Sequence, residues 1–129
     1  MQIKTTRHFL DCMCSNLVNY LPMLRRSLLK NVERCQKISG EFLSAKVMVE
    51  VVKDLEKALL KKQLNSTGEK IKLKLTDATG AALFKILLDF PMREEQTYDN
   101  LVRNNWLEQL NQQIIKPVNE TQPEYYLHS

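Results

Sequence analysis

The segment from Leu43 to Leu64 constrains the fold most strongly, because its apolar residues recur at helical spacing among many lysines. Along one line of this segment every fourth residue is apolar: Leu43, Val47, Val51, Leu55 and Leu59. Four further apolar residues widen that line, namely Met48, Val52, Leu60 and Leu64. A period near 3.6 with so wide an apolar face predicts a long amphipathic helix that packs against a core.

Two helices are predicted before this segment, and the inward apolar side of the first is formed by Phe9, Leu10, Met13, Leu17 and Val18. Thr5 or Thr6 can cap the first, because threonine hydroxyls accept hydrogen bonds from free N–H groups at a helix start. Pro22 marks a junction or kink, and a second helix continues from it to about Ile38. Ser39-Gly40 then ends the second helix, since Gly40 readily takes the left-handed conformation after a helix C-terminus.

Two more helices are predicted in the second half of the chain. One begins after Thr76 or Asp77 and ends at about Asp89, before Pro91. The other opens at Thr97 and ends at Lys116, because proline at the next position lacks the N–H that a helix needs.

Residues 70–75 break the helical pattern, because lysines alternate with Ile71, Leu73 and Leu75. A period of two predicts a half-buried strand, which needs a partner for its backbone groups. That partner could be Gln2-Ile3-Lys4, the C-terminal Tyr125-Tyr126-Leu127, or the same segment of a second copy. Alternatively the segment is merely extended and lies over the helices.

These segments predict a mainly α protein, a single-domain bundle of about five helices, with one short β-strand at 70–75 as an added element. A chain of 129 residues is one domain by length and large enough to bury a core. We assign residues 1–118 to the helical domain and 119–129 to a C-terminal tail.

Basic residues are concentrated in the first half of the chain. Residues 1–64 hold 12 Lys/Arg against 6 Asp/Glu, whereas residues 91–129 hold 3 against 6. This asymmetry suits an anionic partner, but it also arises when two halves attract each other or when helix faces are solvated. The side chains that could contact phosphates are Arg25, Arg26, Lys30, Arg34, Lys37, Lys46 and Lys53.

No set of residues nominates a catalytic or metal site. His8, Cys12, Cys14 and Cys35 are the one plausible ligand set, yet they lack the paired Cys-x₂₋₄-Cys spacing that zinc prefers. The two histidines stand near opposite ends of the chain, and no glycine-rich phosphate loop occurs. The sequence therefore predicts a non-enzyme with no metal and no cofactor.

The fifth predicted helix has an unusual polar side, because amides stand where charged residues normally occur. Uncharged amides cost less to bury in a contact than charges do, so this side could meet a protein partner. The alternative is a plain solvated face, since Asn and Gln are mostly exposed. The residues of the candidate partner face are Asn104, Asn105, Gln109, Gln112 and Gln113.

The function predicted from these features is a non-catalytic cytoplasmic adaptor or accessory protein that acts through protein–protein contacts. The cytoplasm follows from the absence of a signal-like N-terminus, of a membrane-length apolar run and of paired cysteines. The alternative is a small nucleic-acid-binding accessory factor that uses the basic N-terminal half. A homodimer is favoured slightly over a monomer. It would form by pairing of 70–75 across a two-fold axis or through the amide side of the fifth helix, whereas pairing of 70–75 with Tyr125 and Tyr126 would leave a monomer.

Overall fold

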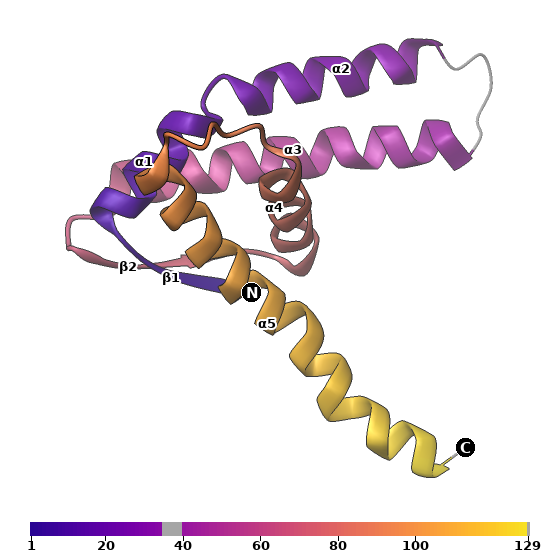
Figure 1. The fold of residues 1–129 in the computed structure, drawn as a ribbon. Helices are drawn as coiled ribbons and strands as arrows, with labels where there is room; N and C mark the ends of the chain where they lie inside the picture. The colour runs from indigo at the N-terminus through magenta and orange to yellow at the C-terminus, as the bar shows by residue number, and fades with distance from the viewer. Residues whose placement is uncertain (35–39, 129) are drawn as a thin grey trace.

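The computed structural model describes residues 1–34 and 40–128, with side chains described except at 41, 42 and 115–128. The elements in chain order are β1 (Gln2–Thr6), α1 (Arg7–Leu17), α2 (Tyr20–Arg34), α3 (Gly40–Asn65), β2 (Lys70–Lys74), α4 (Asp77–Asp89) and α5 (Thr97–His128) (Figure 1). The predicted mainly α fold of five helices with a short strand near 70–75 is therefore confirmed. Over these ranges, none of the helices combines the length and apolarity of a membrane span.

Local sequence signals place the starts of α1 and α4. The Thr6 hydroxyl accepts a hydrogen bond from the Phe9 N–H at 3.2 Å, and the Thr76 hydroxyl accepts one from the Thr79 N–H at 3.1 Å. Both caps were predicted, because a threonine oxygen satisfies a donor that has no partner inside the helix. Pro22 lies in the first turn of α2, where its missing N–H is tolerated.

Two predicted helix ends were wrong. Gly40 does not end α2 in a left-handed conformation; it is the first residue of α3, and the described glycines all lack a positive φ. The preceding residues 35–39, which include Ser39, lie outside the described residues. The assigned span of α5 continues past Lys116 and Pro117. One proline removes a single helical hydrogen bond, which does not by itself require the helix to end.

The predicted strand pairs within the chain. Strands β1 and β2 form a two-stranded antiparallel sheet in which Ile3 lies opposite Leu73 and Thr5 lies opposite Ile71. Of the partners that the sequence left open, the N-terminal Gln2-Ile3-Lys4 segment is thus the one that is used. Because residues 70–74 are paired within the chain, the need for a strand partner no longer favours a homodimer. The homodimer itself stays a prediction.

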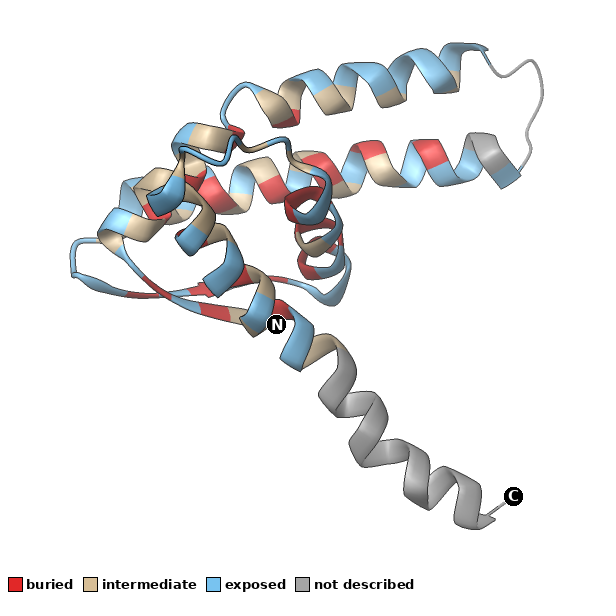
Figure 2. Ribbon diagram, in the orientation of Figure 1, coloured by how far each residue is buried: buried red, intermediate tan, exposed pale blue. Residues whose placement is uncertain are grey.

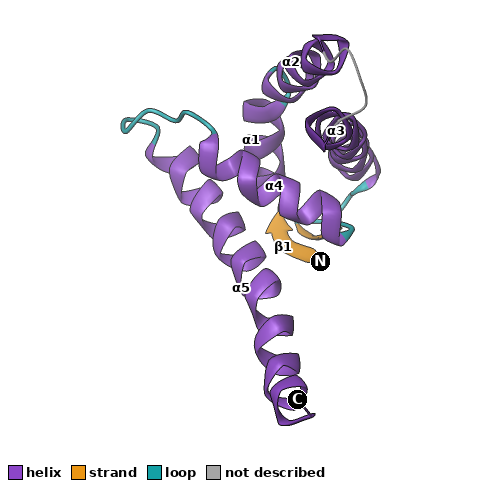
Figure 3. Cartoon of the chain, turned by 90° about the vertical axis from the view of Figure 1, so that its right-hand side faces the viewer, coloured by secondary structure: helices purple, strands orange, loops and turns teal. Residues whose placement is uncertain are grey.

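The core lies where α1, α3, α4, α5 and one face of the sheet meet, and buried residues gather on these facing sides in Figure 2. Trp106 is fully buried in this core, together with Leu10, Leu55 and Leu83. By contrast, Leu21 is the one buried residue among the described positions of α2. Helix α2 packs along α3, and α5 lies beside β1 (Figure 3).

The apolar line predicted for α3 is only partly buried. Leu55 and Leu59 are in the core, but Leu43 and Val47 are 52% and 60% exposed. A step of four residues turns 400°, so the line drifts about 40° at each step and cannot face one direction over five residues. In the N-terminal half of α3, buried residues therefore include some that lie off the predicted line, such as Val49.

Candidate functional site

An apolar groove of about 190 Å³ lies where the junction of α1 and α2 meets the C-terminal half of α3. Its floor is formed by Leu17, Leu21 and Leu59, which are almost fully buried. Its walls are Val18 and Leu60, which are 62% and 57% exposed. Pro22, Cys14, Glu56 and Gln63 complete the lining.

The groove has polar borders that are held in place by hydrogen bonds. Glu56 accepts two hydrogen bonds from Arg25, at 3.1 and 3.2 Å, in a bidentate ion pair between α2 and α3. The Gln63 side chain donates to Asp11 at 3.1 Å, and Arg7 donates to the Gln63 carbonyl at 2.7 Å. Bidentate pairing fixes the geometry of both side chains, so the Glu56 carboxylate is already engaged at this border of the groove.

The exposed walls are the feature that the sequence did not predict. Val18 and Leu60 were both placed on inward faces, and Leu64, one turn after Leu60, is 72% exposed. Val18 caps the C-terminus of α1 with helical backbone angles, so it lies about 100° around the helix axis from the buried Leu17. Leu60 lies one position past the buried Leu59, which turns it about 100° away from the core.

The size of the groove limits what it can bind. Sites for small molecules and cofactors typically enclose roughly 300–1,000 Å³, so this groove is smaller than most of them. Its volume and apolar floor suit one or two apolar side chains presented by another protein. Exposed apolar walls beside an apolar floor, as at Val18 and Leu60, suit a contact with an apolar side chain of another protein.

A second, shallower hollow of about 400 Å³ gathers the titratable residues of α1 and α5, including His8, Asp11, Cys12 and Asp99. The Cys12 thiol donates a hydrogen bond to the Asp99 carboxylate at 3.1 Å. Burial and the Asp99 carboxylate raise the pKa of Cys12 to about 12. A thiol that keeps its proton is a poor nucleophile and a poor metal ligand.

The residues weighed as metal ligands in the sequence, of which His8, Cys12 and Cys14 are described, do not form a common site in the described part of the chain. No group of three or more His, Cys, Asp or Glu side chains there is arranged to hold a metal ion. Cys35 lies outside the described residues. Cys14 faces the apolar groove instead, where burial and the negative charge of Asp11 raise its pKa to about 11, against a smaller opposing effect of Arg7.

We expect Cys12 and Cys14 to react slowly with iodoacetamide at pH 8 in the folded protein. Their pKa values lie above the ordinary 9.0, so the folded chain holds these protons more tightly than the unfolded chain does. The measurement uses a Cys35→Ser variant, in which Cys12 and Cys14 are the remaining cysteines. The alkylation rate of this variant should rise at least about tenfold in 8 M urea, because unfolding lets more thiolate form. The same shifts predict that stability falls as the pH rises above about 9. Equal alkylation rates in the two conditions would contradict the raised pKa values.

The structure brings three of the predicted phosphate-contacting residues together. Arg26, Lys30 and Arg34 recur every four residues along an exposed row of α2. Over the described ranges, these three side chains make no ion pair. They form the one continuous row of basic residues within the predicted set.

The other predicted basic residues do not extend that row. Arg25 is engaged by Glu56 at the groove border, and Lys53 lies 3.5 Å from the Glu50 carboxylate on the same helix. Lys46 is exposed on α3, and Lys37 falls outside the described residues.

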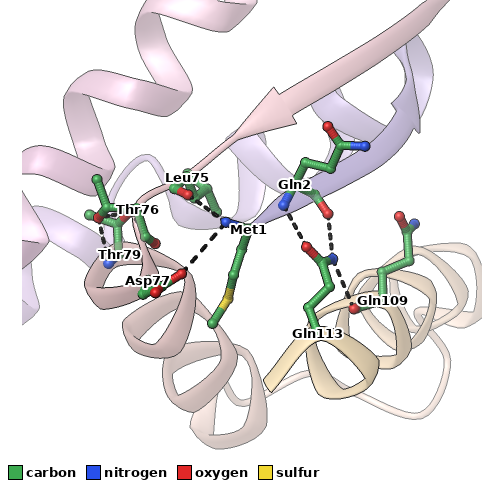
Figure 4. A network of polar contacts seen from close by, with 8 residues as sticks. All are labelled: Met1, Gln2, Leu75, Thr76, Asp77, Thr79, Gln109 and Gln113. Carbon is green, nitrogen blue, oxygen red and sulfur yellow. Dashed lines mark hydrogen bonds and ion pairs between the residues drawn. The ribbon is translucent and has the colours of Figure 1, made fainter. Parts of the chain in front are cut away.

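The amide side of α5 is used in part within the chain. Gln113 accepts a hydrogen bond from the Gln2 backbone N–H at 2.7 Å and donates one to the Gln2 carbonyl (Figure 4). Gln109 repeats this pair on Lys4, at 2.8 and 2.9 Å, and also donates to Asn105. The two glutamines therefore bind the outer edge of β1 as a third strand would.

The rest of the predicted partner face is open. Asn104 and Gln112 are exposed, and Asn105 is exposed beside Gln109. The sequence indicated amides that are suited to burial, and the structure places two of them against the chain's own β1. The chain matches no known family model, no curated protein and no solved structure.

Proposed function

We propose that this chain is a non-catalytic cytoplasmic adaptor or accessory protein that acts by protein–protein contact. The observation that carries the proposal is the apolar groove at the junction of α1, α2 and α3, with its exposed walls Val18 and Leu60. An apolar side chain of a partner would displace water from this groove, which is the dominant favourable term in most protein association.

Four features support a protein partner over a small-molecule reaction. The groove is small, its floor is apolar, and its polar borders are already engaged in hydrogen bonds. The one cysteine that lines it has a raised pKa and so lacks thiolate character at neutral pH. The groove therefore offers shape and apolar surface, which serve binding rather than bond chemistry.

The rival function is nucleic-acid binding, which the row Arg26, Lys30 and Arg34 favours. Three cations in line can neutralise phosphates along a backbone, and such binding weakens steeply as salt is added. Contacts from these three cations to phosphates alone would give binding without sequence specificity.

Site-specific crosslinking in cells that express the chain tests the proposal. The photo-reactive residue p-benzoylphenylalanine at position 60 should give one adduct of discrete mass, because it stands at the groove wall. The same residue at position 88 is the matched control, since Leu88 is also more than half exposed but lies on α4, which contributes no residue to the groove lining. Val18→Asp should lower the yield of the position-60 adduct at least about tenfold, because a charge would then have to be buried in the contact.

Fluorescence anisotropy against random DNA and RNA tests the rival. We expect weak binding at 200 mM salt that Val18→Asp does not change. Micromolar binding with a steep salt slope, lost in the variant Arg26→Glu/Lys30→Glu/Arg34→Glu, would favour nucleic-acid binding.

In the crosslinking experiment, an equal yield of adduct from positions 60 and 88 would contradict the groove as the contact surface.

A further inference from the structure

The outer edge of β2 differs from the outer edge of β1. The β1 edge is closed by Gln109 and Gln113, whose side chains bind its backbone. On β2, no hydrogen bond within the described chain reaches the backbone groups that point away from β1. The sheet therefore has one closed edge and one open edge.

The ladder identifies which residues make up the open edge. Met1 and Leu75 exchange both of their backbone hydrogen bonds, at 2.9 and 2.7 Å. In an antiparallel pair such bonded positions alternate with positions whose N–H and C=O groups point outward. The outward groups on β1 belong to Gln2 and Lys4, as their bonds to the glutamines show. On β2 they belong to Lys70, Lys72 and Lys74, which lie opposite Thr6, Lys4 and Gln2.

The side chains of the three residues at this edge are all positively charged, and all lie on the exposed face of the sheet. All three lysines of β2 are exposed, whereas Ile71 and Leu73 are buried beneath them. A strand added at this edge would place alternate side chains beside the lysines and the others toward the apolar face of the sheet. Carboxylates would be favoured at the first set of positions and apolar side chains at the second.

We propose that the open edge of β2 binds an extended segment of another protein in which acidic and apolar residues alternate, by adding it as a third strand. Backbone hydrogen bonds to Lys70, Lys72 and Lys74 would supply the attachment, and the lysine side chains would select for acidic partners. This edge shares no residue with the groove between α1, α2 and α3. Binding at the edge can therefore be tested independently of binding at the groove.

A second copy of the chain is a poorer occupant of this edge. Antiparallel pairing of two β2 strands would set lysines of one copy directly beside lysines of the other. Like charges in such cross-strand positions are destabilising. The same lysines hinder uncontrolled association between edges, which is compatible with recognition of an acidic strand.

The test uses a fluorescein-labelled decapeptide of alternating Glu and Val, titrated into the full chain. We expect saturable binding at 150 mM salt, and slowing of amide hydrogen exchange by about tenfold at Lys70, Lys72 and Lys74 in the bound state. The same peptide N-methylated at every second residue carries equal charge but loses half of its donors. It should bind at least about tenfold more weakly if the backbone makes the contact.

Two variants separate backbone pairing from charge. Lys72→Pro removes one outward N–H and leaves the bonds to β1, so it should weaken binding more than Lys72→Ala, which removes the same charge only. The variant Lys70→Glu/Lys72→Glu/Lys74→Glu reverses the charge of the edge. It should no longer bind the Glu/Val peptide and should instead bind a peptide of alternating Lys and Val. Circular dichroism of each variant reports whether the fold is kept.

Three results would overturn the proposal. One is equal binding of the N-methylated and unmodified peptides, which would indicate attraction by charge alone. Another is no binding of the Glu/Val peptide by a folded chain. The third is a concentration-dependent dimer in sedimentation equilibrium, in place of the 15.1 kDa monomer, that protects these three amides without any peptide.

Discussion

Trp106→Ala is expected to lower the free energy of unfolding by about 3–5 kcal/mol, as large-to-small changes at fully buried aromatic residues do. Trp106 is fully buried in the core between α5 and the sheet. Its indole N–H donates a hydrogen bond to the Thr5 hydroxyl of β1 at 3.1 Å. The change therefore removes core volume and leaves a buried hydroxyl without its donor. Urea denaturation followed by circular dichroism at 222 nm measures the loss.

Two further variants show which part of Trp106 matters. Thr5→Val keeps the shape but leaves the indole N–H without an acceptor, at a cost of about 1–3 kcal/mol. Leu101→Ala, on an exposed position of the same helix, should change stability by less than about 0.5 kcal/mol. A Trp106→Ala loss no larger than that of Leu101→Ala would show that Trp106 does not hold α5 against the sheet.

The double variant Gln109→Leu/Gln113→Leu is expected to lower stability by about 1–3 kcal/mol, because four hydrogen bonds of about 0.5–1.5 kcal/mol are lost and water replaces some of them. The two glutamines fit β1 because their spacing matches that of the strand. Four residues rise about 6 Å along a helix, and two residues advance about 6.8 Å along a strand. Each side-chain amide carries one acceptor and two donors, so it can bond to both an N–H and a C=O as a neighbouring peptide group would.

Gln112→Leu is the matched control, since Gln112 lies between the two glutamines in sequence but is exposed. It should leave stability and amide exchange unchanged. In the double variant, the amides of Gln2 and Lys4 should exchange faster, because they lose their acceptors. Unchanged exchange at both amides would mean that the glutamines do not close this edge in solution.

The two proposed surfaces make different demands on a partner. The groove beside Val18 takes an apolar side chain, whereas the open edge of β2 takes an extended backbone with acidic side chains. Val18→Asp is expected to affect the first alone, and Lys72→Pro the second alone. A partner that used both surfaces would lose affinity in each variant separately, by additive amounts if the sites are independent.

Local structure was predictable from the sequence where the signal lies within one segment. The Thr6 and Thr76 caps each involve a hydroxyl and an N–H three residues away, so a short stretch contains both partners. The alternation at 70–75 likewise specifies a half-buried strand, because side chains in a strand point to opposite faces in turn. The signal for each feature lies within its own segment, although the strand still needs a partner elsewhere in the chain for its backbone groups.

The partners of those segments were decided only by the tertiary structure. The sequence allowed residues 70–75 several partners, and the fold pairs Ile71 and Leu73 with β1, about 70 residues earlier. It also sets Gln113 against Gln2, 111 residues away, and turns Val18 and Leu60 outward from faces that were predicted to be buried. Periodicity reports that a residue has an apolar or polar neighbour, but not which element supplies it. That choice depends on how the helices and the sheet pack together around the core, and it created both the groove and the single open edge of the sheet.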